Sequence, residues 1–403
     1  MNPVYLDLAS LKCSIVYCLH WNIGNIRNIG NILLLMNKDG TFQKNIFMTS
    51  TKTNIKSLTH DELQSRLLGL GLKKFRSDQI LKWLYTNYAL SFEDMTNIAK
   101  SERSLLSSVF FISKPTVART EVSNDGTQKF LFELEDKHTV ESVLIPDENR
   151  LTLCISSQIG CRLACRFCLT GKEGFQRDLK SYEIADQVLE VSRILNRGES
   201  CRITNIVLMG MGEPLENFEE VVKAIKVITS SKGLGFSPRR VTLSSAGLVP
   251  EIAALAKAGV KVNLAISLNA TSDEARNRIM PVNKRYPIQK LLTACRRFPL
   301  EPRRRITFEY VMLKDVNDTE NDALRLVMLL KGMRCKVNLI PFNPYPGSEF
   351  KKPDDVVVRR FQKILLDHHY TAPVRQSRGG DISAACGQLK AREPMTCNER
   401  LTI

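Results

Sequence analysis

The feature that most constrains the fold is an alternation of apolar, strand-like segments with helical segments between residues 151 and 366. The strand-like segments cover residues 151–156, 206–209, 241–244, 262–267, 306–313 and 337–340. The helical segments begin at residue 181 and continue in 218–228, 250–257, 273–279, 321–330 and 354–366. Such alternation is typical of a parallel sheet with right-handed crossover helices. A closed barrel has eight such units, so these segments predict an α/β fold with an open, partial (βα)6 barrel and its site at the carboxyl ends of the strands.

Cysteine is unusually crowded in one part of the chain. Four of the eleven cysteines lie between residues 154 and 168. Disulfide scaffolds are typical of short secreted chains, and this chain has 403 residues. We find no secretory signal and no apolar run near the roughly 18 residues that cross a bilayer. We therefore expect a cytoplasmic protein without a membrane segment, in which crowded cysteines bind metal or do redox chemistry.

The most informative motif is Gly160-Cys161-Arg-Leu-Ala-Cys165-Arg-Phe-Cys168, which closely follows the first strand-like segment. Four-iron clusters are normally held by four cysteine thiolates. Three ligands would leave one iron open for a substrate or cofactor. A zinc site would more usually be built from paired cysteine or histidine units completed to four ligands, and a chance grouping is the remaining alternative.

The residues around this triplet extend the pattern into a series of motifs. The series covers residues 152–168, 174–177, 208–215, 241–244, 265–269, 338–344 and 381–389. In this order the motifs closely resemble those of the RlmN/Cfr family of radical S-adenosylmethionine (SAM) adenine methyltransferases, from about residue 57 to residue 390. The resemblance implies a radical-SAM partial barrel with one [4Fe-4S] cluster per chain, held by Cys161, Cys165 and Cys168. It also implies an open iron for SAM and two SAM molecules per turnover.

Further residues at strand ends match family positions that contact SAM. By this resemblance Gly212 and Glu213 hold the methionyl end of SAM, since a carboxylate can accept a hydrogen bond from an amine. The remaining contacts are Ser244, Ser267, Leu268, Asn269 and Asn343. Some relatives have His in place of Asn269. Taken singly, each residue could equally be an ordinary strand-end cap or turn.

Three residues match the family's catalytic positions. Cys386 would receive a methyl group from one SAM, Cys154 would resolve the covalent intermediate with RNA through a transient disulfide, and Glu141 would act as general base. From the residues alone, Cys386 could be a small buried hydrophobe. Cys154 could be an inward-facing strand residue, and Glu141 a solvent-facing one.

The implied reaction is methylation of carbon 2 of an adenosine in 23S ribosomal RNA and in transfer RNA (tRNA). Residues 212–214 and 341–344 look more like the carbon-2 branch than the carbon-8 (Cfr) branch, which is the alternative. From a different class, the rival is a non-catalytic iron–sulfur or zinc protein that binds RNA. Neither an open coordination position nor the Gly-Glu segment at 212–213 is needed by such a protein.

Charge and resemblance together predict the partners. Lys and Arg exceed Asp and Glu by 58 to 42, a formal net charge of +16, which suits a polyanion. We expect the basic surface, including residues 303–305, to meet RNA phosphates, and the target base to leave its stack. The other expected partner is an electron donor such as flavodoxin or ferredoxin, and the chain is expected to be a monomer.

The domain organisation is predicted in five parts. Residues 1–50 form an N-terminal appendage, either disordered or upstream of a true start near Met36 or Met48. Residues 55–112 form a small helical domain with possible RNA contacts, in which Thr59 and Glu62 predict a capping box. Its second helix carries an apolar stripe made by Ile80, Leu81, Leu84, Tyr85 and Tyr88. Residues 113–148 form a short β-hairpin connection with a turn near 124–126, 149–390 the barrel and 391–403 a tail.

Overall fold

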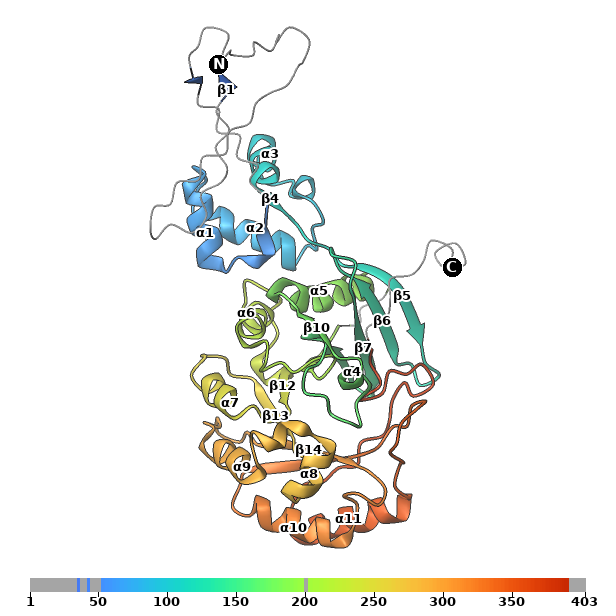
Figure 1. The fold of residues 1–403 in the computed structure, drawn as a ribbon. Helices are drawn as coiled ribbons and strands as arrows, with labels where there is room; N and C mark the ends of the chain where they lie inside the picture. Colours follow the sequence, from blue (N-terminus) through green and yellow to red (C-terminus); the bar gives the residue numbers. More distant parts are fainter. Residues whose placement is uncertain (1–34, 37–41, 44–51, 199–201, 391–403) are drawn as a thin grey trace, which may run out of the picture.

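A nine-stranded sheet organises the molecule, seen in a computed structural model that describes residues 35–36, 42–43, 52–198 and 202–390 (Figure 1). The strand order is β15-β14-β13-β12-β11-β8-β7-β6-β5. The first six are the predicted strands, and each pairs in parallel with its neighbours among them. Their bounds are β8 Arg150–Ile155, β11 Asn205–Leu208, β12 Val241–Ser245, β13 Asn263–Ser267, β14 Ile306–Met312 and β15 Cys335–Pro341. This confirms the partial barrel of six strand–helix units.

The predicted crossover helices are present as well. They are α5 Ser181–Gly198, α6 Phe218–Thr229, α7 Val249–Leu255, α8 Asp273–Ile279, α10 Glu320–Leu330 and α11 Asp355–Asp367. Two further helices of this region were not predicted: the short α4 (Leu169–Lys172) and α9 (Ile288–Arg297), which follows α8. The large apolar core between strands and helices includes Leu153, Ile206, Leu243, Ile266, Phe308 and Val337. The strands contribute apolar residues to this core, and polar residues such as Ser244 and Asn338 occupy intervening positions.

The connection before the barrel is larger than the expected hairpin. It has three antiparallel strands, β5 (Thr116–Val122), β6 (Gln128–Glu133) and β7 (Thr139–Asp147). β7 also pairs antiparallel with β8, so these strands extend the barrel sheet. The predicted turn at 124–126 joins β5 to β6, and a second turn at 134–138 joins β6 to β7.

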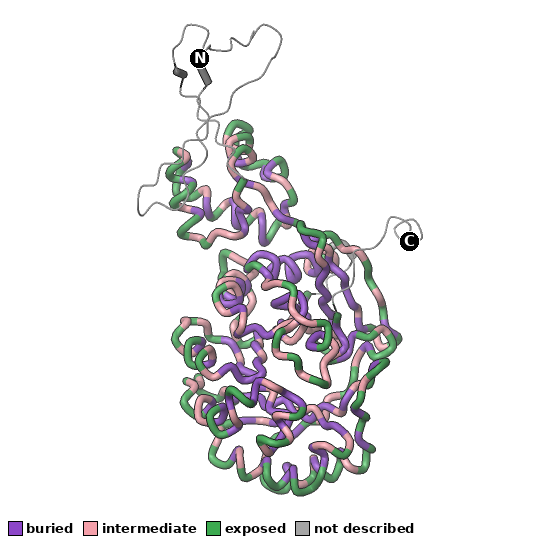
Figure 2. The backbone as a smooth tube through the Cα atoms, in the orientation of Figure 1, coloured by how far each residue is buried: buried purple, intermediate pink, exposed green. Residues whose placement is uncertain are grey.

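The small helical unit packs beside α5 (Figure 1). It contains α1 (His60–Gly69), α2 (Arg76–Tyr85) and α3 (Lys100–Val109), together with the parallel pair β3 (Thr53–Asn54) and β4 (Phe110–Phe111). The Thr59–Glu62 capping box is present. Ile80, Leu81, Leu84 and Tyr85 are buried in a core separate from that of the barrel. Figure 2 colours buried residues of the helical unit purple. Tyr88 lies beyond the end of α2, so it is not part of the helix, but it packs against the same core.

A buried ion pair ties the helical unit to the barrel. Lys56 Nζ lies 2.6 Å from Asp186 Oδ1 on α5, and both side chains are at most 3% exposed. The Ser113 hydroxyl donates to the other oxygen of Asp186. Burial raises the pKa of Asp186 despite the nearby ammonium, so the pair as a whole contributes little net stability, but either charge left alone would be costly.

Replacing Lys56 with Met is expected to lower the free energy of unfolding by about 3–5 kcal/mol, because it strands a buried carboxylate. Urea unfolding measures this loss. The double variant Lys56→Met/Asp186→Leu should recover most of it. A loss below about 1 kcal/mol in the single variant would mean that the pair is hydrated in solution.

The appendage predicted for residues 1–50 falls mostly outside the described residues, as does the tail at 391–403. Of the first segment, only β1 (Leu35–Met36) and β2 (Phe42–Gln43) are described, and they pair antiparallel. Among the described residues no helix is long and apolar enough to span a membrane.

Candidate active site

A cavity opens at the carboxyl ends of the parallel strands, where a barrel of this kind places its chemistry. Ten of the thirteen predicted site residues line it: Cys161, Cys165, Cys168, Gly212, Glu213, Ser244, Ser267, Asn269, Asn343 and Cys386. Leu268, Cys154 and Glu141 do not. The predicted residues come from seven separate segments of the chain, and the fold brings most of them to one place.

The three cysteines of the motif sit on a loop that is closed at its base by two short strands. β9 (Gln158–Gly160) pairs antiparallel with β10 (Phe175–Asp178), and Cys161 N–H donates to Gly174 carbonyl at 2.8 Å. Gly160 has φ +75°, and a Cβ there would lie 1.8 Å from the Gly174 oxygen. Only glycine therefore fits at the entry to the loop.

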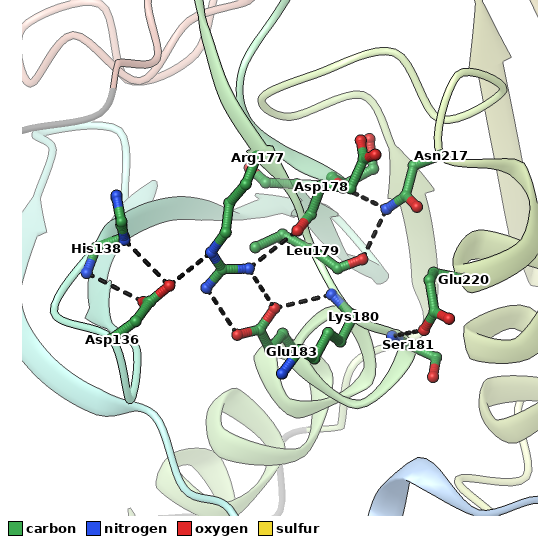
Figure 3. Close-up of polar contacts among 12 residues, drawn as sticks. Asp136, His138, Arg177, Asp178, Leu179, Lys180, Ser181, Glu183, Asn217 and Glu220 are labelled. Atoms are coloured by element: carbon green, nitrogen blue, oxygen red, sulfur yellow. Dashed lines mark hydrogen bonds and ion pairs between the residues drawn. The ribbon is translucent and has the colours of Figure 1, made fainter. Parts of the chain in front are cut away.

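Arg177 on β10 fixes this base to two other elements (Figure 3). Its guanidinium donates to both carboxylate oxygens of Glu183 on α5, at 2.8 and 2.9 Å. Its Nε donates to Asp136 in the turn between β6 and β7, at 2.6 Å. Bidentate pairs of this kind combine charge with fixed geometry. The Gly-Phe-Gln-Arg motif at 174–177 thus anchors the cysteine loop.

The thiol groups of the loop suit a positively charged metal group. Burial raises the pKa of Cys161 to about 12, and it also raises the pKa values of Cys165 and Cys168. Metal ligands must be thiolates, and iron would supply the positive charge that three adjacent thiolates need in this buried place. Among the described residues no three side chains are arranged to hold a single metal ion.

The loop that carries Cys386 lies directly against the cysteine loop. Leu169 N–H, next to Cys168, donates to Gly387 carbonyl at 2.8 Å. The Thr170 hydroxyl donates to Leu389 carbonyl at 2.6 Å. Cys386 itself is exposed at the cavity. Residues more than 200 positions apart in the sequence thus place this thiol beside the expected cluster ligands.

Glu213 is a buried carboxylate at the end of β11. It accepts N–H hydrogen bonds from Ala246 at 2.8 Å and from Leu215 at 3.1 Å. Burial raises its pKa to about 7, although these hydrogen bonds oppose the shift. A cationic ligand group beside it would stabilise the ionised form. Gly212 has φ +96°, and a Cβ there would lie 2.5 Å from the Cβ of Gln158, so this glycine serves loop packing and not only approach to a ligand.

The other predicted SAM contacts differ in whether their side chains line the cavity and in whether those side chains already have hydrogen-bond partners in the protein. Ser244, Ser267 and Asn343 line it and are half-buried. Asn269 lines it too, but its Oδ1 accepts the Val311 N–H at 2.8 Å, and its φ is +56°, a conformation that Asn tolerates better than most residues. Leu268 is fully buried and contributes backbone: its carbonyl accepts from Arg276 Nε at 2.9 Å.

Cys154 and Glu141 lie beside the cavity without lining it. Val143 on β7 is the register partner of Cys154 on β8, and alternate residues of a strand share a face, so Glu141 and Cys154 are on one face. Burial, with a contribution from nearby Cys386, raises the pKa of Cys154 to about 12. Glu141 is fully buried and accepts the Lys390 N–H at 3.0 Å.

Three charged residues of the site were not predicted from the sequence. Arg276 on α8 is fully buried and donates to the carbonyls of Leu268, Ala246 and Ser267, holding the ends of two strands. Glu309 and Arg375 line the cavity, and burial raises the pKa of Glu309. Glu309 lies in the predicted strand at 306–313, and an acidic residue within an apolar strand is the only signal that could have found it.

Comparison with known protein families now adds to this geometry. The Ribosomal RNA large subunit methyltransferase N-terminal domain matches residues 53–112, and the Radical SAM superfamily matches residues 155–327. A protein from Desulfosudis oleivorans called "Dual-specificity RNA methyltransferase RlmN" is 52% identical over 344 residues, 85% of this chain and 92% of its own. A protein of the same name from Geobacter sulfurreducens is 52% identical over 342 residues, 85% of this chain and 93% of its own.

The chain belongs to the RlmN family. The crystal structure of a radical SAM methyltransferase from Sphaerobacter thermophilus agrees, with a TM-score of 0.80 and 41% identity over 85% of this chain and 99% of that one. As a member of the RlmN family the chain is an enzyme that uses SAM and a four-iron cluster and acts on RNA. The family prediction made from the motifs is confirmed.

Proposed function

We propose that this enzyme methylates carbon 2 of an adenosine in 23S ribosomal RNA and in tRNA through a methyl group carried on Cys386. The observation that carries the proposal is the hydrogen-bonded contact between the Cys386 loop and the cysteine loop, through Leu169 and Gly387. This contact puts an exposed thiol in the same cavity as the three expected cluster ligands. A structural metal site would need no such neighbour.

In this proposal Cys161, Cys165 and Cys168 hold one [4Fe-4S] cluster whose fourth iron stays open for SAM. Gly212, Glu213, Ser244, Ser267, Leu268, Asn269 and Asn343 hold SAM. Together the cluster and SAM supply the radical chemistry that activates the methyl group on sulfur. Such activation suits the target, because carbon 2 of adenine is electron-poor and does not attack an ordinary methyl donor.

Thiol chemistry then releases the product. The sulfur of Cys154 attacks the sulfur of Cys386, the sulfur–carbon bond to the modified base breaks, and its electron pair stays on the carbon, which takes up a proton. A Cys154–Cys386 disulfide remains, which two electrons and two protons from an external thiol or reductase return to two thiols. The guanidinium of Arg375 opposes the rise in the pKa of Cys154, which favours the attacking thiolate.

Glu141 is proposed as the base that removes the proton from carbon 2. The Lys390 N–H holds one of its oxygens. Its other oxygen lies 3.6 Å from Lys129 Nζ, and the side chain is fully buried, so contact between this carboxylate and the base requires a local rearrangement of the residues that cover it. We further propose a monomer that works in the cytoplasm and receives electrons from a flavodoxin or ferredoxin, and a division of the chain into the five parts given above.

Anaerobic incubation of the reduced enzyme with SAM and RNA tests the proposal. We expect 5′-deoxyadenosine and S-adenosylhomocysteine to form together, in roughly one-to-one ratio, with 2-methyladenosine in nuclease digests of the RNA. Appearance of 8-methyladenosine instead would assign the enzyme to the carbon-8 reaction. Full iron content without either SAM product would favour a non-catalytic RNA-binding protein.

A further inference from the structure

A second cavity lies at the opposite end of the barrel from the active site. It has a volume of about 590 Å³ and is lined by Thr242, Asn263, Thr307 and Lys336 near the amino ends of β12 to β15, together with Arg239 and Arg303. The active-site cavity is lined by Ser244, Ser267, Glu309 and Ile340 of the same four strands. Asn263 and Ser267 are four residues apart on β13, which at 3.3 Å per residue puts them about 13 Å apart along the strand.

The charge of this second cavity is unbalanced. Arg239, Arg303, Arg304, Arg305 and Lys336 line it. Arg304 is engaged with the Lys261 carbonyl at 2.6 Å. Within residues 52–198 and 202–390, none of the other four cations forms an ion pair. The carboxylate of Glu301, at the start of the same turn, pairs with Lys261 at 3.0 Å and also interacts electrostatically with Arg304 and Arg239. Five cations around one hollow outweigh this single carboxylate and repel each other, so an anion bound there would be stabilised.

The lining also indicates which kind of anion fits. Apart from Pro302, every residue that lines the cavity has a polar side chain able to donate a hydrogen bond. Protein–protein interfaces usually have an apolar centre, which is missing here. Nucleic-acid interfaces are polar and strongly positive, and arginine guanidinium groups match phosphate oxygens in geometry.

We propose that this cavity, which we call the basal cavity, binds phosphates of the RNA substrate at a distance from the target base. The inference rests on the RNA substrate proposed above. Because the basal cavity and the active site open at opposite barrel ends, one RNA can reach both only by passing around the barrel. An isolated hairpin that delivers its adenosine to the active site would be too small, whereas a whole tRNA or a ribosomal RNA domain would not.

The triple variant Arg239→Gln/Arg303→Asn/Arg305→Gln tests this inference. All three side chains are exposed. Arg303 has φ +64°, and Asn tolerates that conformation, so the fold should persist and a thermal melt checks it. The matched control is Arg359→Gln/Arg360→Gln/Lys363→Gln, which removes three exposed charges from α11.

Fluorescence anisotropy with a full-length tRNA transcript and with its isolated target hairpin gives the readout. For the full-length RNA, the triple variant should raise Kd on the order of tenfold and lower the slope of log Kd against log salt by about 2–3. Its Kd for the hairpin should stay within about twofold of wild type, as should both values for the control variant.

Three results would overturn the inference. The first is an equal loss of affinity for hairpin and whole tRNA, and the second is an equal loss in the triple and control variants. The third is unchanged RNA binding together with slower reduction by an acidic flavodoxin, which would make the basal cavity a docking site for a protein. Wild-type methylation of the hairpin is measured in parallel, so that failure of the methyltransferase proposal is seen separately.

Discussion

Replacing any one of Cys161, Cys165 and Cys168 with Ala is expected to abolish SAM cleavage and to reduce cluster iron to background. The three thiols sit on one short loop in one cavity, so no single ligand is redundant in the proposed cluster. The loss should be complete and not graded, because a four-iron cluster held by two thiolates has two open irons and is readily lost. Iron analysis and visible absorbance after anaerobic reconstitution measure the cluster, and 5′-deoxyadenosine release measures SAM cleavage.

Cys295→Ala is the matched control for this experiment. Cys295 is also buried, and burial raises its pKa to about 12 as well, but it lies on α9 and does not line the cavity. Its variant should keep full iron content and SAM cleavage. Full iron content in any of the three loop variants would remove that residue from the ligand set.

Replacing Cys386 and Cys154 with Ala is expected to stop the reaction at two different stages. Cys386→Ala removes the atom that carries the methyl group, so no methyl should reach RNA while the cluster still assembles. Cys154→Ala should allow addition to the base and prevent release, because no thiol can attack the sulfur of Cys386. Enzyme should then accumulate covalently bound to RNA, as a slow-migrating band that nuclease removes.

The double variant Cys154→Ala/Cys386→Ala separates this mechanism from a structural role for either thiol. It should give no covalent band, since the carrier atom is gone. Cys335→Ala, at another buried cysteine outside the cavity, should turn over normally. Normal turnover by Cys154→Ala, or a stalled enzyme without the covalent band, would mean that Cys154 is a buried structural residue with no part in the reaction.

Much of the barrel could be predicted because its strands are short apolar segments bounded by polar turns. Helix α9 was missed because Pro281 and Pro287 interrupt the segment between it and α8. The three strands β5 to β7 were recognised only as a hairpin, since the strand pattern does not say that β7 pairs with β8. Which strands pair depends on the arrangement of the whole sheet, and the local pattern of apolar and polar residues does not predict it.

The site residues also divide into those that a local motif predicts and those whose role depends on distant parts of the chain. The cysteine triplet and the Gly-Glu pair are contiguous motifs and could be identified by spacing. Arg276 could not, because its role depends on carbonyls contributed by two different strand ends. Residues 303–305 could be recognised as basic, but only the fold places them at the barrel end opposite the active site.

The contact between Gly387 and Leu169 also bears on when the active site becomes complete during synthesis. A ribosome makes the cysteine loop long before residues 386–390, and a chain that has emerged only as far as α11 already contains every residue that lines the cavity except Arg375, Cys386 and Gly387. In such a nascent chain the cysteine loop lacks its cover. Iron delivered at that stage would reach an uncovered cysteine loop. In the finished protein, the segment that contains Cys386 covers this loop.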